Sequence, residues 1–102
     1  MNSNTNTNVI VNWKNSKDFN EFLQSHLTDE NRLTTQEIGM IRMFIYAYEN
    51  DIHVTIHSLI VLCNCGQRRV ESTLKSLSEN NLLKRERAGN NINDGFRYVL
   101  NL

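Results

Sequence analysis

The sequence predicts an α+β fold that is mainly α: a three-helix core and a C-terminal β-hairpin, with an extra strand and helix at the N-terminus. Apolar residues recur at helical spacing in three consecutive stretches between residues 35 and 79. A loop bounded by Gly89 and Gly95 then leads into residues 96–102, where apolar and polar residues alternate as in a half-buried strand. The chain has 102 residues, of which 39% are hydrophobic and 22% charged, and this suits one compact globular domain.

The first 32 residues divide into two predicted segments. Residues 1–15 form a mobile Asn/Thr-rich tail with a short strand at Val9–Val11, whose partner is either the hairpin or another subunit. Residues 16–32 form an amphipathic helix, over about 17–27, followed by a polar loop, and Ser16 is the predicted N-cap. The apolar face of this helix consists of Phe19, Phe22, Leu23 and Leu27.

The main domain, residues 33–102, begins with two helices that each have a recognisable N-cap. Thr34 and Glu37 have the spacing of a capping box and predict a helix over about 35–49. Thr55 caps a second, shorter helix that ends at the turn Asn64-Cys65-Gly66. The inward residues are Ile38, Ile41, Ile45 and Tyr48, with Phe44 beside them, on the first helix, and Ile56, Leu59, Ile60 and Cys63 on the second.

A third helix, from about Gln67 to Glu79, precedes the hairpin. Its apolar residues Val70, Leu74 and Leu77 share one face, which predicts that this face is buried. Asn80-Asn81 ends the helix, since asparagine tolerates the left-handed conformation. The hairpin strands are predicted at 82–87 and 96–102. Phe96 and Tyr98 are expected in the core, and either of them, if exposed, could instead stack on an unpaired base.

The stretch from Leu59 to Arg85, LIVLCNCGQRRVESTLKSLSENNLLKR, resembles the winged helix-turn-helix superfamily of bacterial regulators and of plasmid and phage replication proteins. The resemblance covers about residues 33–102 and departs from the usual pattern in two places. The turn glycine comes one or two positions late, and Asn80-Asn81 replaces an ending with glycine. The chain is also similar in overall pattern to the small winged-helix single-stranded-DNA-binding proteins of staphylococcal cassette chromosome elements. A more remote similarity is to the centromere-binding adaptors of tubulin-type plasmid partition systems.

This resemblance implies a non-catalytic DNA-binding protein of a mobile genetic element that acts in replication or maintenance. Single-stranded DNA is one expected ligand, and the alternatives are a duplex operator or a plasmid-partition site. The third helix would read the nucleic acid, and cations of the hairpin would contact phosphates. The expected DNA-binding residues are Gln67, Arg68, Arg69, Ser72, Thr73, Lys75, Lys84, Arg85, Arg87 and Arg97. Lys84, Arg85, Arg87 and Arg97 could instead neutralise Glu86 and Asp94 across the hairpin.

The charge distribution gives partial support to DNA binding. The formal net charge is zero, which argues against a strong nonspecific clamp on duplex DNA. The two halves differ, however. Residues 1–53 carry four Lys or Arg and seven Asp or Glu, whereas residues 54–102 carry seven and four. The basic half contains the predicted third helix and the hairpin.

No other chemistry stands out in the sequence. Cys63 and Cys65 are too close in sequence for an ordinary disulfide, and a zinc site would need further ligands, for which His53 and His57 are the nearest histidines. We therefore expect no metal, no cofactor and no catalytic site. No apolar run approaches the roughly 20 residues of a membrane helix. The polar start MNSNTNTN does not resemble a secretory signal, so a cytoplasmic location is expected.

Two expectations concern protein partners. Winged-helix DNA-binding proteins of this size are often homodimers, and replication proteins are further candidate partners. A different class of function is a protein-interaction module in which the apolar face of the helix within 16–32 is the partner or dimer surface. The other interpretation of that face is that it packs on its own domain.

Overall fold

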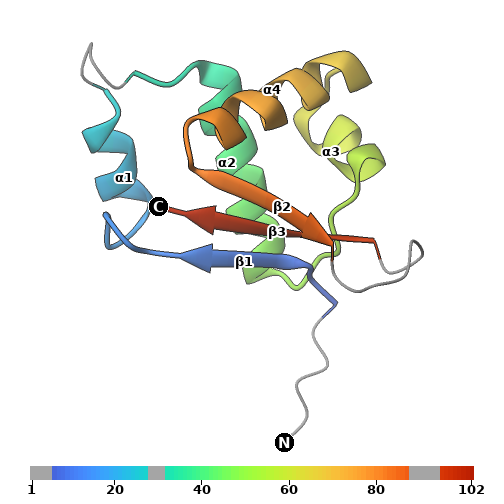
Figure 1. Cartoon of the computed structure of the whole chain (residues 1–102), viewed down its shortest axis with the longest axis horizontal. Helices are drawn as coiled ribbons and strands as arrows, with labels where there is room; N and C mark the ends of the chain where they lie inside the picture. Colours follow the sequence, from blue (N-terminus) through green and yellow to red (C-terminus); the bar gives the residue numbers. More distant parts are fainter. Residues whose placement is uncertain (1–5, 28–31, 88–94) are drawn as a thin grey trace, which may run out of the picture.

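The computed structural model describes residues 6–27, 32–87 and 95–102, and within them the fold is α+β, with four helices and a three-stranded sheet (Figure 1). The elements are β1 (Val9–Asn12), α1 (Phe19–Ser25), α2 (Thr35–Glu49), α3 (Ile56–Cys63), α4 (Gln67–Glu79), β2 (Leu83–Arg87) and β3 (Phe96–Asn101). α2 crosses one face of the sheet, while α3 and α4 lie together beyond the β2 edge (Figure 1). Most of the predicted glycine-bounded loop, residues 88–94, lies outside the described residues.

The N-terminal strand is part of the sheet, in the order β1-β3-β2. β1 runs parallel to β3 with Val9 opposite Tyr98, and β2 runs antiparallel to β3 with Leu83 opposite Leu100. All four of these side chains are buried, so they form the helix-facing row of the sheet. Asn8 fixes the entry to β1, because its side-chain amide exchanges hydrogen bonds of 2.8 and 2.7 Å with the backbone of Val54. Of the two partners expected for the strand, the hairpin is the observed one.

The helices contribute most of the core. Buried apolar side chains come from every helix, and the core of the main domain continues into α1 through Phe22, which has no exposed surface. Phe19 is partly buried against the same core and is stacked by the Arg42 guanidinium at 5.4 Å. The apolar face of α1 therefore packs on its own domain. Among the described residues 16–27, Leu27 alone is a large exposed apolar residue, at 55% exposure and outside the helix.

Three details of the predicted helices are wrong. α1 is shorter than expected, and its N-cap is Asp18, which accepts a hydrogen bond of 2.9 Å from the backbone of Glu21, while Ser16 is buried. Both residues are good caps, and the sequence alone does not say which one is free to cap. Tyr48, predicted to face inward, is 46% exposed, although the neighbouring Ala47 is fully buried.

The predicted caps of α2 and α3 and the left-handed end of α4 are confirmed. Capping boxes join Thr34 to Glu37 and Thr55 to Ser58. Asn81 has φ 62°, and the backbone N–H of Leu82 then donates to the carbonyl of Leu77 at 3.0 Å. This turn leads directly into β2, and it therefore sets the position of the hairpin relative to α4.

Candidate nucleic-acid interface

α4 has the orientation that a groove-binding helix requires. Val70 and Leu77 have no exposed surface and Leu74 is 6% exposed, so this face packs inward as predicted. At 100° per residue, the opposite face carries Arg68, Ser72 and Lys75, all of which are exposed. A row of polar and cationic side chains therefore runs along the outside of α4.

Three other predicted residues of α4 are turned away from this row or form hydrogen bonds within the protein. Thr73 is 6% exposed, and its hydroxyl donates to the backbone carbonyl of Arg69 at 2.8 Å, which removes it from the candidate site. Arg69 faces α2. With the Gln36 amide turned so that its oxygen faces the guanidinium, this oxygen accepts from Nη1 of Arg69 at 2.9 Å. Gln67 is exposed but donates to Glu71 Oε2 at 3.1 Å.

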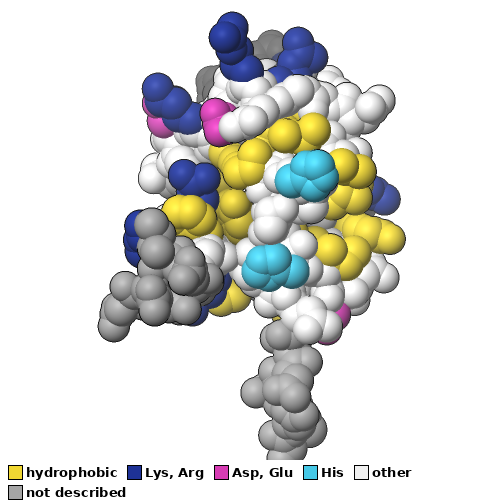
Figure 2. Space-filling model, turned by 90° about the vertical axis from the view of Figure 1, so that its right-hand side faces the viewer, with side chains coloured by type: hydrophobic (Ala, Val, Ile, Leu, Met, Phe, Trp, Pro, Cys, Tyr) yellow, Lys and Arg dark blue, Asp and Glu magenta, His cyan; other side chains and the backbone are white. Residues whose placement is uncertain are grey.

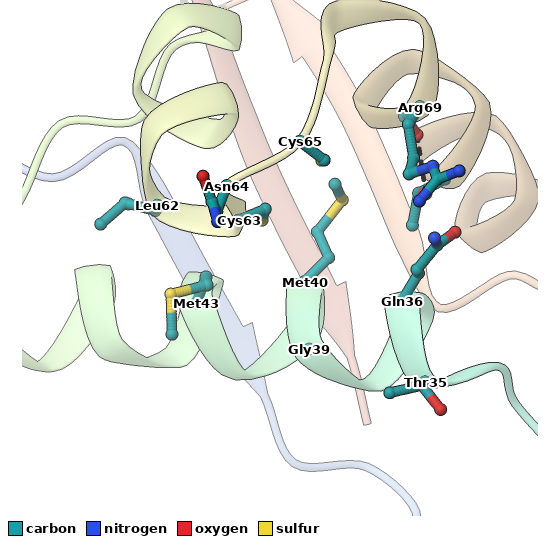
Figure 3. A pocket seen from close by; sticks show the side chains of 11 residues that line it. Thr35, Gln36, Gly39, Met40, Met43, Leu62, Cys63, Asn64, Cys65 and Arg69 are labelled. Carbon is teal, nitrogen blue, oxygen red and sulfur yellow. Dashed lines mark hydrogen bonds between the residues drawn. The ribbon is translucent and has the colours of Figure 1, made fainter.

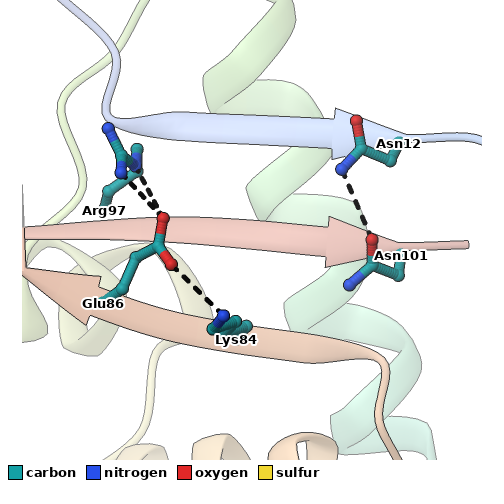
Figure 4. A network of polar contacts seen from close by, with 5 residues as sticks. All are labelled: Asn12, Lys84, Glu86, Arg97 and Asn101. Atoms are coloured by element: carbon teal, nitrogen blue, oxygen red, sulfur yellow. Dashed lines mark hydrogen bonds and ion pairs between the residues drawn. The ribbon is translucent and has the colours of Figure 1, made fainter.

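Two predicted hairpin residues lie on the face of the sheet opposite the helices, where they neutralise a carboxylate (Figure 4). Arg97 donates to Oε1 of Glu86 from Nε at 3.0 Å and from Nη2 at 2.8 Å. Lys84 Nζ lies 3.6 Å from the other oxygen. The hydrogen bonds from Arg97, with the charges of both cations, hold the pKa of Glu86 below its ordinary value. For Arg97 the alternative interpretation, neutralisation of Glu86 across the hairpin, is therefore the observed one, whereas Lys84 pairs with Glu86 along its own strand.

The other two hairpin cations are on the helix-facing side and stack on an aromatic ring. Arg85 lies opposite Tyr98 and Arg87 opposite Phe96, so all four side chains belong to the same face of the hairpin. The guanidinium carbons of Arg85 and Arg87 lie 4.6 and 5.8 Å from the centre of the Phe96 ring. Tyr98 is buried as predicted, but Phe96 is 39% exposed. The expectation that Phe96 belongs to the core is wrong. Toward the start of β3, Tyr98 is the last buried side chain on the helix-facing side, and Phe96 is the next residue on that side.

A shallow hollow connects the cationic row on α4 with the cations on the helix-facing side of the hairpin. It lies between α4 and β2, and its walls include Lys75 from the helix and Arg85 from the strand. Glu71 lies in the same hollow and would repel a phosphate there. Its position four residues before Lys75 puts both side chains on the outer face of α4. Seen from the α3 side, Lys and Arg atoms gather at the top and along one edge of the molecule (Figure 2).

A second depression, a groove of about 360 Å³, lies between α2 and the end of α3 (Figure 3). Met40, Met43, Cys63 and Cys65 contribute to its walls, and both cysteines are free and half-buried. Burial raises the pKa of the Cys63 thiol, and the neighbouring Cys65 raises it further. No group of three or more His, Cys, Asp or Glu in the described parts of the chain could hold a metal ion.

The comparisons with known proteins leave the family open, since no family model, no curated protein and no solved structure matches this chain. Among the residues that the structure describes, no helix is both long and apolar enough to cross a membrane.

Proposed function

We propose that this chain is a non-catalytic DNA-binding protein with a winged helix-turn-helix fold, in which α4 is the recognition helix and the β2–β3 hairpin is the wing. The order of α2, α3, α4 and hairpin supports this assignment, as does the outward face of α4. In this fold the N-terminal strand β1 completes the sheet on the far side of the hairpin. A role in replication or maintenance of a mobile element is part of the proposal and rests on the sequence resemblance alone.

The observation that carries the proposal is the hollow shared by Lys75 and Arg85, with Arg68 exposed at the start of α4 and Arg87 exposed at the end of β2. In the described residues, none of these four cations forms an ion pair, whereas Lys84 and Arg97 are both paired with Glu86. A phosphate backbone lying along this hollow would contact unpaired cations from both the helix and the hairpin. Such contacts position the nucleic acid without reading its sequence.

The exposed ring of Phe96 favours single-stranded DNA as the ligand. An unpaired base can stack on an aromatic face, whereas the bases of a duplex are already stacked on one another. Phe96 is 39% exposed and is flanked by two arginines, so it combines a stacking surface with cations for the adjoining phosphates. The zero net charge also suits a ligand with fewer phosphates per unit length than a duplex.

The experiment is a titration of labelled DNA, followed by fluorescence anisotropy at about 50 and 200 mM salt. One ligand is a single strand of about 16 nucleotides and the other is the matching duplex. We expect salt-dependent binding that is tighter for the single strand. Tighter binding to the duplex would assign the site to operator or partition DNA instead, and no salt-dependent binding to either ligand would overturn the proposal.

Two double variants with the same change of charge locate the site. Lys75→Ala with Arg85→Ala removes two cations from the hollow, and we expect weaker binding with a salt slope shallower by about 1.4 for a single strand. Lys84→Ala with Arg97→Ala removes two cations from the opposite face and is the matched control, with little loss expected. Equal losses in both variants would mean that only overall charge matters.

A third variant tests base stacking separately. Phe96→Leu keeps an apolar side chain but removes the aromatic face, and the loss of one stacked base lowers affinity by about 5- to 150-fold. The loss should be confined to the single strand. An equal loss on duplex DNA would show that Phe96 supports the hairpin rather than stacks on a base.

A further inference from the structure

The groove between α2 and α3 gathers sulfur atoms from two separate parts of the chain. Met40 comes from α2, and Cys63 and Cys65 come from the end of α3 and the turn after it. Met40 is buried, and its side chain rises from α2 toward Cys65, while Met43 lies one turn further along the helix (Figure 3). Four sulfur atoms, two of thiols and two of thioethers, thus line one depression.

The two thiols share this groove because the helix ends between them. In a continuous helix, residues two apart point about 200° away from each other, so Cys63 and Cys65 would lie on opposite sides. Asn64 instead adopts the left-handed conformation, with φ 52° and ψ 49°. The Asn64 N–H then donates to Val61 O, and the Cys65 N–H donates to Ile60 O, both at 3.3 Å. This pair of bonds is a Schellman motif, and it turns the chain so that Cys65 lines the same groove as Cys63.

The chemistry of these ligands selects a soft cation. Thiolate and thioether ligands prefer Cu(I), whereas a structural zinc site needs four ligands. In the described part of the chain no third His, Cys, Asp or Glu joins the two cysteines. We propose that Cys63 and Cys65, with the Met40 thioether as a third ligand, bind one Cu(I) ion in this groove.

The test uses the full chain under reducing, anaerobic conditions and without DNA. Cu(I) is added in competition with bicinchoninate, and the reactivity of both thiols toward Ellman's reagent is followed in the same samples. We expect one Cu(I) per monomeric chain and simultaneous protection of both thiols. Zn(II) at the same concentration should leave both thiols reactive. Because no DNA is present, failure of this experiment leaves the proposed DNA binding untouched.

Single variants assign the ligands, and circular dichroism checks that each one is folded. Cys63→Ser and Cys65→Ser should each lower Cu(I) affinity by more than about 100-fold, the upper end of what loss of an outer-shell partner costs. Met40→Leu should lower it by about tenfold, while Met43→Leu, a matched control on the same helix, should leave it unchanged. An unchanged affinity in either cysteine variant would overturn the site, and an unchanged affinity in Met40→Leu would remove the third ligand.

One further result would overturn the proposal. Two chains could each supply one cysteine to a bridging ion, and sedimentation would then show a dimer at half a Cu(I) per chain. A monomer at one Cu(I) per chain supports the intramolecular site.

Discussion

Glu37 connects the start of α2 to the end of α4, and we predict that replacing it with glutamine destabilises the fold by about 1.5 kcal/mol at neutral pH. One carboxylate oxygen accepts from the backbone N–H of Thr34 at 2.8 Å and closes the capping box. The other accepts from the Ser76 hydroxyl and, at 3.4 Å, from the Asn80 amide. The side chain is 5% exposed, so water screens these contacts weakly.

The magnitude follows from what a glutamine side chain keeps and what it loses at this position. The Glu37→Gln change preserves the shape and one oxygen acceptor, but hydrogen bonds to a charged group contribute about 1 kcal/mol more than neutral ones. The negative charge at the third position of α2 adds about 0.5 kcal/mol through the helix dipole. In a domain of this size, the sum corresponds to a drop in melting temperature of about 6–12 °C.

The same contacts predict how the effect depends on pH. Burial alone would raise the pKa of Glu37, but hydrogen bonds from Ser76, Thr34 and Asn80 outweigh it, so the pKa in the folded protein lies below its ordinary value. A carboxylate with a lowered pKa contributes stability above its unfolded pKa, which is about 4.3. That contribution is lost as the pH falls through the folded pKa. The difference between wild type and Glu37→Gln should therefore be full at pH 7 and shrink below about pH 4.

Urea unfolding followed by circular dichroism at neutral and acidic pH measures both effects. Glu49→Gln is the matched control, because Glu49 is exposed and lies at the other end of α2. Its replacement should change stability by less than about 0.5 kcal/mol. Equal midpoints for wild type and Glu37→Gln at pH 7, or a difference that persists unchanged in acid, would refute this account of Glu37.

Three further variants test other parts of the structure. Leu77→Ala should cost about 2–5 kcal/mol in urea unfolding, because Leu77 has no exposed surface; a cost under about 1 kcal/mol would mean that this face is not packed. Asn81→Gly should be neutral or stabilising and Asn81→Val destabilising by about 1 kcal/mol or more, since φ is 62°; the reverse order of melting temperatures would contradict the left-handed turn. Glu71→Gln should tighten DNA binding by about 2- to 5-fold at low salt, because it removes a negative charge from the hollow; weaker binding would place the DNA elsewhere.

Much of the helical part could be predicted because its signals are local. The capping box of Thr34 and Glu37 marks the start of α2 within four residues of sequence, and the spacing of Val70, Leu74 and Leu77 fixes which side of α4 is buried. The same spacing could have identified Thr73. It lies three residues after Val70 and four before Leu77, so it belongs to the buried face despite its polar side chain. Residue type alone made it a candidate for DNA contact.

The hairpin was less predictable because its features depend on register and on where the core ends. Alternation places Phe96 and Tyr98 on one face, but it does not say that the core covers Tyr98 and leaves Phe96 exposed. The pairing of Glu86 with Arg97 requires these residues to be opposite each other, and this is set by the length of the connecting loop. The sequence therefore identified the cations of the hairpin but not which of them pair with Glu86.

This division of the cations explains how a chain of zero net charge can have a cationic surface. Glu86 forms ion pairs with Lys84 and Arg97 on the outer face of the sheet. Arg85 and Arg87 lie on the helix-facing side, where Lys75 and Arg68 are also exposed. Four phosphate contacts give a salt slope of only about −3 on a single strand, so electrostatic attraction alone fades by roughly 50-fold between about 50 and 200 mM salt. Affinity that survives at the higher salt must come from contacts without charge, and Phe96 is the side chain at this surface that can supply them by stacking.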